Sequence, residues 1–98
     1  MESDPIGTPG LARNEFEAIH AFTAVMWRKL IANAHKGGWK NNLAEELLER
    51  LHEEVEELER AIMEDDNPQN IAKECADVAN FCMMIADVVG GLPYERPA

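Results

Sequence analysis

Hydrophobic residues recur every three or four positions in three stretches of the chain, which is the spacing of one face of a helix. These stretches predict helices over about 15–34, 42–64 and 68–89, and no stretch alternates apolar and polar residues as a half-buried strand would. Short connections predict that successive helices are antiparallel neighbours. We therefore expect an all-α fold: one domain, built as a small antiparallel helical bundle with a core like that of a four-helix bundle, completed by oligomerisation.

Capping residues and glycine pairs predict where the helices begin and end. Gly37-Gly38 and Gly90-Gly91 predict the ends of the first and third helices. Together these signals divide the chain into a flexible N-terminal arm (1–13), a helical domain (14–91) and a C-terminal tail (92–98). The three predicted helix starts are Asn14 with Glu17, Asn42 with Glu45, and Asn67 with Pro68.

The second helix is strongly acidic, and its glutamates point in different directions. At about 100° per residue, its apolar positions form one arc. Glu54 shares a sector with Leu43 and Ala61, so its carboxylate is predicted at the buried border. Glu57 follows one turn later and Glu53 lies beside it. The apolar arc consists of Leu47, Leu51, Val55, Leu58 and Ile62, and the glutamates opposite it are Glu45, Glu49 and Glu56.

The third helix is apolar nearly all round, which predicts that it is central or covered by another subunit. Glu74 and Asp77 nevertheless occupy a sector of this helix that also holds Phe81 and Met84. A covered carboxylate is costly unless it is paired or binds a metal ion. Facing glutamates on the second helix would repel these two acids and raise their pKa values, so a divalent cation between the helices resolves the conflict.

The predicted ligand set is all oxygen, without histidine or cysteine. Such ligands suit the hard ions Mg²⁺ or Mn²⁺. The number of carboxylates suggests more than one ion, with a phosphate-bearing substrate completing the coordination. The residues of this set are Glu53, Glu54, Glu57, Glu74 and Asp77.

The net charge of the chain limits its partners. It is −10, from nineteen acids against nine Lys and Arg, which disfavours binding to nucleic acid or to an anionic membrane. No apolar run approaches the roughly 20 residues that span a bilayer, and the first residues lack a signal-peptide pattern. We expect a cytoplasmic protein whose cysteines, Cys75 and Cys82, stay reduced.

A cationic stretch interrupts the acidic sequence. No Asp or Glu occurs from Ala18 to Ala44. Lys36 and Lys40 flank Gly37-Gly38, where a flexible backbone could bring both ammonium groups to a phosphate chain. Trp39 between them either stacks on a base or plugs the junction between helices. For the other two cations of the stretch, Arg28 and Lys29, a surface stripe is an equal alternative.

The acidic residues also resemble a known motif pair. Glu53-Glu54-x-x-Glu57, followed after sixteen residues by Glu74-x-x-Asp77, resembles the EExxE and ExxD motifs of the MazG-like all-α nucleoside triphosphate pyrophosphohydrolase superfamily. The resemblance covers about residues 15–90 and suggests a short, single-domain member. It implies cleavage of a nucleoside triphosphate, of unspecified base, between the α and β phosphates.

The resemblance also implies roles for individual residues. Glu54, Glu57, Glu74 and Asp77 would hold Mg²⁺, for which Mn²⁺ could substitute, while Glu53 would orient or deprotonate the attacking water. The products would be a monophosphate and pyrophosphate, in house-cleaning of the (deoxy)nucleotide pool by a homodimer or homotetramer. Residues assigned to the substrate are Lys36 and Lys40 for the outer phosphates, and Trp39, Asn80 and His20 for the sugar or base.

Two other functions compete with this interpretation. A di-iron carboxylate bundle would use Glu17-x-x-His20 and Glu49-x-x-His52, but Glu49 and His52 lie opposite the apolar arc. A non-enzymatic acidic helical interaction module would bind a partner through Phe81 and its neighbouring methionines. That second alternative leaves the carboxylates of the third helix unexplained.

Overall fold

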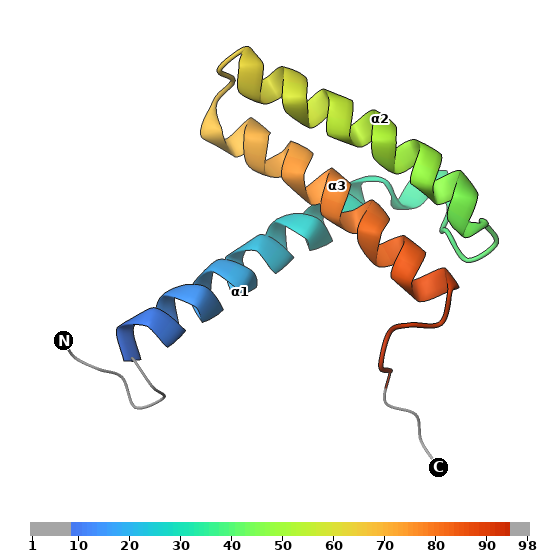
Figure 1. Cartoon of the computed structure of the whole chain (residues 1–98), viewed down its shortest axis with the longest axis horizontal. Helices are drawn as coiled ribbons and strands as arrows, with labels where there is room; N and C mark the ends of the chain where they lie inside the picture. Colours follow the sequence, from blue (N-terminus) through green and yellow to red (C-terminus); the bar gives the residue numbers. More distant parts are fainter. Residues whose placement is uncertain (1–8, 95–98) are drawn as a thin grey trace.

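The structure, a computed structural model, describes residues 9–94, with side chains from residue 14 onward. It contains helix α1 (Pro9–Ala32), a short 3₁₀ helix η1 (Ala34–Lys36), α2 (Ala44–Met63) and α3 (Pro68–Val88), and no strand within these residues. Helices α2 and α3 lie side by side as an antiparallel hairpin, and α1 crosses α3 (Figure 1). The predicted all-α fold is confirmed.

The α2–α3 hairpin forms the best-packed part of the molecule. Leu47 and Ala61 of α2 and Ala76 of α3 are buried, and Ala76 is completely inaccessible to solvent. The turn between the helices is fixed by Asn67, whose side-chain oxygen accepts a hydrogen bond of 2.8 Å from the backbone N–H of Asn70. Pro68 occupies the first turn of α3, so the predicted cap at this position is confirmed.

Helix α1 packs on α3 rather than on α2. The side chain of Asn80 on α3 donates a hydrogen bond of 3.1 Å to the backbone carbonyl of Met26, which ties the two helices at their crossing. The prediction that all successive helices are antiparallel neighbours is therefore wrong for α1. Helix α1 crosses α3 and is joined to α2 by the segment between them. Helix α3 is apolar nearly all round because both α1 and α2 pack against it.

Two predicted helix starts also need correction. Helix α1 begins at Pro9, so Asn14 lies inside it and does not cap it. The N-cap of α2 is Leu43, one residue beyond Asn42, and the backbone N–H of Leu43 donates to the side chain of Glu46 at 3.0 Å. Asn42 donates to the same carboxylate. Of the predicted arm and tail, residues 1–8 and 95–98 lie outside the described residues.

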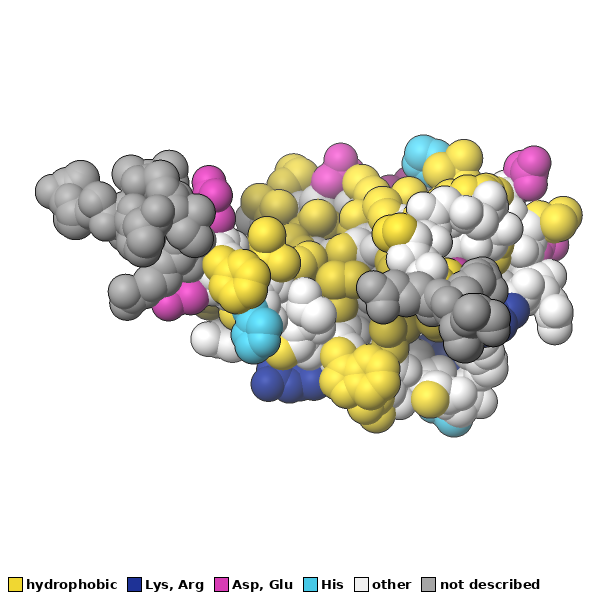
Figure 2. Space-filling view, turned by 90° about the horizontal axis from the view of Figure 1, so that it is seen from below, with side chains coloured by type: hydrophobic (Ala, Val, Ile, Leu, Met, Phe, Trp, Pro, Cys, Tyr) yellow, Lys and Arg dark blue, Asp and Glu magenta, His cyan; other side chains and the backbone are white. Residues whose placement is uncertain are grey.

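Several large apolar side chains are not covered by the described part of the chain. Figure 2 shows hydrophobic side chains gathered on one face of the molecule. Ile62, a member of the apolar arc predicted for the second helix, is 56% exposed, so the described residues do not cover this end of the arc. No helix within residues 9–94 is both long enough and apolar enough to cross a membrane. The most exposed apolar residues of α1 are Phe16, Ile19, Trp27 and Ile31.

Candidate active site

Three carboxylates from two helices converge at the α2–α3 interface. One oxygen each of Glu54, Glu57 and Glu74 lies within 4.8 Å of the others. Glu54 and Glu74 are half-buried and Glu57 is exposed. Because residues three or four apart share one side of a helix, the EExxE spacing directs Glu54 and Glu57 together toward α3. The structure thus brings together three of the four predicted metal ligands.

The protein leaves the charge of this cluster largely uncompensated. Burial, followed by the nearby Glu57 and Asp77 carboxylates, raises the pKa of Glu54 and also that of Glu74 above the usual range. Oε1 of Glu74 is buried and has no hydrogen-bond partner among the described residues. A buried acceptor without a donor is unusual in a native protein and calls for a ligand.

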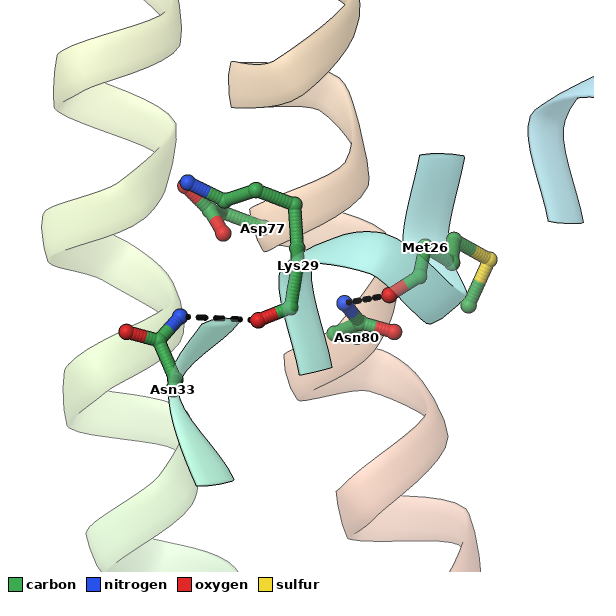
Figure 3. Close-up of polar contacts among 5 residues, drawn as sticks. All are labelled: Met26, Lys29, Asn33, Asp77 and Asn80. Atoms are coloured by element: carbon green, nitrogen blue, oxygen red, sulfur yellow. Dashed lines mark hydrogen bonds and ion pairs between the residues drawn. The ribbon is translucent and has the colours of Figure 1, made fainter. Parts of the chain in front are cut away.

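Asp77, the fourth predicted ligand, lies beside the cluster but is paired. Its Oδ2 is 3.3 Å from Nζ of Lys29, which reaches over from α1 (Figure 3). Its charge is among the causes that raise the pKa values of Glu54 and Glu74. Asp77 therefore belongs to the same electrostatic group, with a basic side chain at one of its oxygens.

A cavity of about 650 Å³ is lined by Glu54, Glu57 and Asp77, though not by Glu74, and extends to the loop that precedes α2. Lys29, Lys36 and Arg50 contribute three cations to its lining. The Arg50 guanidinium lies 5.3 Å from the ring centre of Phe81, an arrangement that favours a cation–π contact. The lining, which also includes Glu46 and Glu49, thus combines carboxylates suited to cations with basic side chains suited to phosphate oxygens.

The loop end of the cavity is held by Asp87 near the end of α3. Trp39 donates its indole N–H to Oδ2 of Asp87 at 2.8 Å, and the hydroxyl of Tyr94 donates to Oδ1 of the same residue. These hydrogen bonds, that of Tyr94 first, hold the pKa of Asp87 below its ordinary value. The ring of Trp39 lines the cavity with its polar N–H already bonded.

The remaining predicted site residues divide between the cavity and its surroundings. Lys36 and Asn80 line the cavity, and Asn80 is buried with its amide committed to the carbonyl of Met26. Glu53 does not line it; its side chain is 66% exposed and pairs with Arg50 at 3.6 Å. Lys40 lines a separate, smaller hollow. His20 is exposed on α1 and lies outside the lining of both hollows.

Two of the three cations in the cavity were not predicted as site residues. Arg50 lies one turn before Glu54 on α2, so its spacing could have placed it on the same side of the helix. For Lys29 the sequence leaves a surface stripe as an equal alternative, because only the crossing of α1 over α3 brings its ammonium group to Asp77. The di-iron alternative loses its support: the histidines it requires, His20 and His52, are exposed and lie outside the cavity lining.

The donor set fits a divalent metal ion. The converging ligands are carboxylate oxygens, which suit Mg²⁺ or Mn²⁺ rather than softer metals. A bound cation would satisfy the buried Oε1 of Glu74 and offset the burial and repulsion that raise the pKa values of Glu54 and Glu74. Exposed acidic groups alone would be weak support; the buried oxygen without a donor makes the fit specific.

Comparison with known proteins assigns the chain to a family. The model of the phosphoribosyl-ATP pyrophosphohydrolase family matches residues 19–96, most of the chain, so this protein belongs to that family. The family lies in the MazG-like all-helical superfamily and consists of hydrolases that act on pyrophosphate bonds. The matched region includes α2, α3 and all the residues of the carboxylate cluster.

A curated relative gives a shorter match. An uncharacterized protein of Archaeoglobus fulgidus is 45% identical over 47 residues, which cover 48% of this chain and 50% of that protein. The chain thus spans about half the length of the relative that it matches. No solved structure matches the chain significantly.

Proposed function

We propose that this protein is a divalent-metal-dependent pyrophosphohydrolase that cleaves a nucleoside triphosphate between its α and β phosphates. The observation that carries the proposal is the group of Glu54, Glu57 and Glu74, whose oxygens converge beside a cavity that Glu54 and Glu57 line together with three cations. An acidic cluster without the cations would suit a structural ion. The two together suit a substrate that brings metal-bound phosphates.

The carboxylates would hold the metal, with Asp77 as the fourth ligand. When bound, the ion neutralises phosphate charge and lowers the pKa of a bound water. Arg50 and Lys36 bind the β and γ phosphates, and the contact with Phe81 restrains the Arg50 guanidinium. The ring of Trp39 forms a stacking surface for the base, and the buried Oδ1 of Asn80, unpartnered among the described residues, accepts a hydrogen bond from the nucleotide.

The chemical step is displacement at phosphorus by water. A water oxygen attacks the α phosphorus, the bond from this phosphorus to the bridging oxygen breaks, and pyrophosphate leaves. Glu53 takes the proton of the water in this proposal, which follows its place in the EExxE motif. Its side chain now pairs with Arg50 on the solvent side of α2, so it would turn toward the cavity when phosphates engage Arg50.

Two substrate classes fit the proposal. The family name gives phosphoribosyl-ATP, which is an adenosine triphosphate that carries a further phosphoribosyl group. The alternative is a canonical or damaged (deoxy)nucleoside triphosphate, cleaved in house-cleaning of the nucleotide pool. Substrates of both classes would place a triphosphate against the cations of the cavity. They differ in the base or phosphoribosyl-bearing group that would contact Trp39.

A substrate panel tests the proposal. Purified protein is incubated with Mg²⁺ or Mn²⁺ and with phosphoribosyl-ATP or each nucleoside triphosphate, and the products are separated by chromatography. We expect equal amounts of monophosphate and pyrophosphate from one substrate class, and none in excess EDTA. Glu56→Gln is the matched control, since Glu56 is exposed on α2 and outside the cavity lining. No product from any substrate would contradict the proposed activity.

We also propose that the protein acts as a homodimer or homotetramer. Phe16, Ile19 and Trp27 on α1 are 71%, 65% and 62% exposed, and large exposed apolar side chains on one helix of a small chain are often covered by another subunit. Light scattering should give a multiple of the 11.0 kDa chain mass. A monomer at micromolar concentration would contradict this assembly.

A further inference from the structure

Lys29 places a positive charge beside the cluster of acidic side chains. Its Nζ is 3.3 Å from Oδ2 of Asp77, and the side chains of Lys29 and Asp77 are only 29% and 19% exposed. Among the ion pairs of the described residues, this one reaches the proposed metal ligands, whereas Arg50 pairs with Glu53 outside the cavity. Lys29 therefore occupies, in part, the electrostatic position of a metal ion.

The backbone around Lys29 is fixed on both sides. The carbonyl of Lys29 accepts a hydrogen bond of 3.1 Å from the side chain of Asn33, and one turn earlier the carbonyl of Met26 accepts from Asn80 (Figure 3). The helix consequently holds the Cα of Lys29 at the crossing of α1 over α3. Only its flexible four-carbon side chain is free to move its ammonium group.

The same side chain also lines the cavity, together with Lys36 and Arg50. An ammonium group on a flexible stem can therefore contact either Asp77 or a phosphate oxygen in the cavity without movement of the helix. A divalent ion on Asp77 would repel the ammonium group, whereas the phosphates that accompany the ion would attract it.

We propose that Lys29 is an exchanging counter-ion: it neutralises Asp77 in the metal-free protein and transfers to a substrate phosphate when the metal ion binds. This inference rests on the proposed function, and it adds a substrate-binding residue on α1 to those on α2, on α3 and in the segment between α1 and α2. The exchange keeps the charge of the cavity closer to neutral in both states. It also opposes binding of the metal ion without substrate.

Removal of the Lys29 charge should therefore have two opposite effects. Without nucleotide, Lys29→Met should bind Mn²⁺ about two- to fivefold more tightly, because a competing cation in a part-exposed pair is lost. With the metal ion present, the same variant should bind a triphosphate roughly tenfold more weakly, because a charge-assisted hydrogen bond is lost. A purely structural role for Lys29 would not produce opposite signs.

Calorimetric titrations provide the test. Mn²⁺ is titrated into wild type, Lys29→Met and Lys29→Arg, and then the α,β-methylene analogue of ATP is titrated with Mn²⁺ at saturation. Arg28→Met is the matched control: Arg28 is adjacent and exposed, and it lies outside the cavity lining, so both affinities should stay near wild type. Lys29→Arg should also stay close to wild type. Lys29→Gln replaces Lys29→Met if the latter does not fold.

The outcomes separate this inference from the proposed activity. Unchanged or weaker Mn²⁺ binding by Lys29→Met would overturn the counter-ion role, and unchanged binding of the analogue would overturn the transfer to phosphate. Neither titration involves turnover. If Lys29→Met shows both effects but the wild-type protein hydrolyses no substrate, the exchange would be supported and only the proposed function would be contradicted.

Discussion

Two groups of carboxylates near the cavity are in opposite situations. Near the end of α3, each oxygen of Asp87 accepts a hydrogen bond, from Trp39 and Tyr94, and its pKa is lowered. At the α2–α3 interface, the pKa values of Glu54 and Glu74 are raised. Where a carboxylate has a structural role, the fold supplies donors. Where it does not, a bound ligand is needed to supply the positive charge.

The largest expected effect comes from the carboxylates at the α2–α3 interface. Glu54→Gln or Asp77→Asn should lower kcat/KM for pyrophosphate release more than about a hundredfold, because each removes a proposed metal ligand. A coupled assay for pyrophosphate measures this loss. Glu56→Gln should remain active, and retention of activity by Glu54→Gln would refute the assigned centre.

Metal binding should stabilise the protein through the same residues. At 100 times the dissociation constant, an ion that binds only the folded state stabilises it by about 2.7 kcal/mol. Thermal unfolding with and without Mg²⁺ should show this increase for wild type and little of it for Glu54→Gln. An equal increase in both proteins would place the ion elsewhere.

The pH dependence of stability should have opposite signs for the two groups of carboxylates. The raised pKa values of Glu54 and Glu74 favour the metal-free folded state below their ordinary value of 4.5, and this contribution is lost as the pH rises through the raised values. The lowered pKa of Asp87 stabilises the fold above its ordinary value of 3.8, and this contribution is lost as the pH falls through the lowered value.

Thermal unfolding in EDTA at pH 7 tests this contrast. Glu54→Gln should raise the melting temperature of the metal-free protein, because it removes a repelled charge, whereas Asp87→Asn should lower it. A decrease in both variants would show that the two groups of carboxylates are equivalent, contrary to the comparison.

The smallest effect is expected at the loop. Trp39→Phe keeps a ring but loses the donor to Asp87, so it should raise KM severalfold and leave the affinity for Mn²⁺ unchanged. Combining Trp39→Phe with Asp87→Asn should raise KM little further, since both changes disrupt the same hydrogen bond between Trp39 and Asp87. Steady-state kinetics of the single and double variants measure this coupling, and fully additive effects would contradict it.

The sequence was most informative where a pattern is local. Helical periodicity predicted α2 and α3 within a few residues, and the sector that Glu54 shares with Ala61 predicted its inward direction, because both depend on the geometry of one helix. The all-α class and the meeting of Glu54, Glu57 and Glu74 across the hairpin followed from these local patterns together with a short connection.

Contacts between distant segments could not be predicted in this way. Trp39 and Asp87 are 48 residues apart, and nothing in either local pattern relates them. The pairing of Lys29 with Asp77 depends on α1 crossing α3, which is set by the path of the loop rather than by periodicity. For Lys29 and Arg50, the helical position fixes the Cβ direction, but a long side chain determines where the charge lies.

The most direct test of the metal centre is a crystal structure of the protein with Mn²⁺, with anomalous scattering from manganese recorded. We expect anomalous density bonded to oxygens of Glu54, Glu57 and Glu74, with the ammonium group of Lys29 displaced from Asp77. Manganese absent from this position, at a concentration that supports pyrophosphate release, would contradict the central claim that these carboxylates form the catalytic metal site.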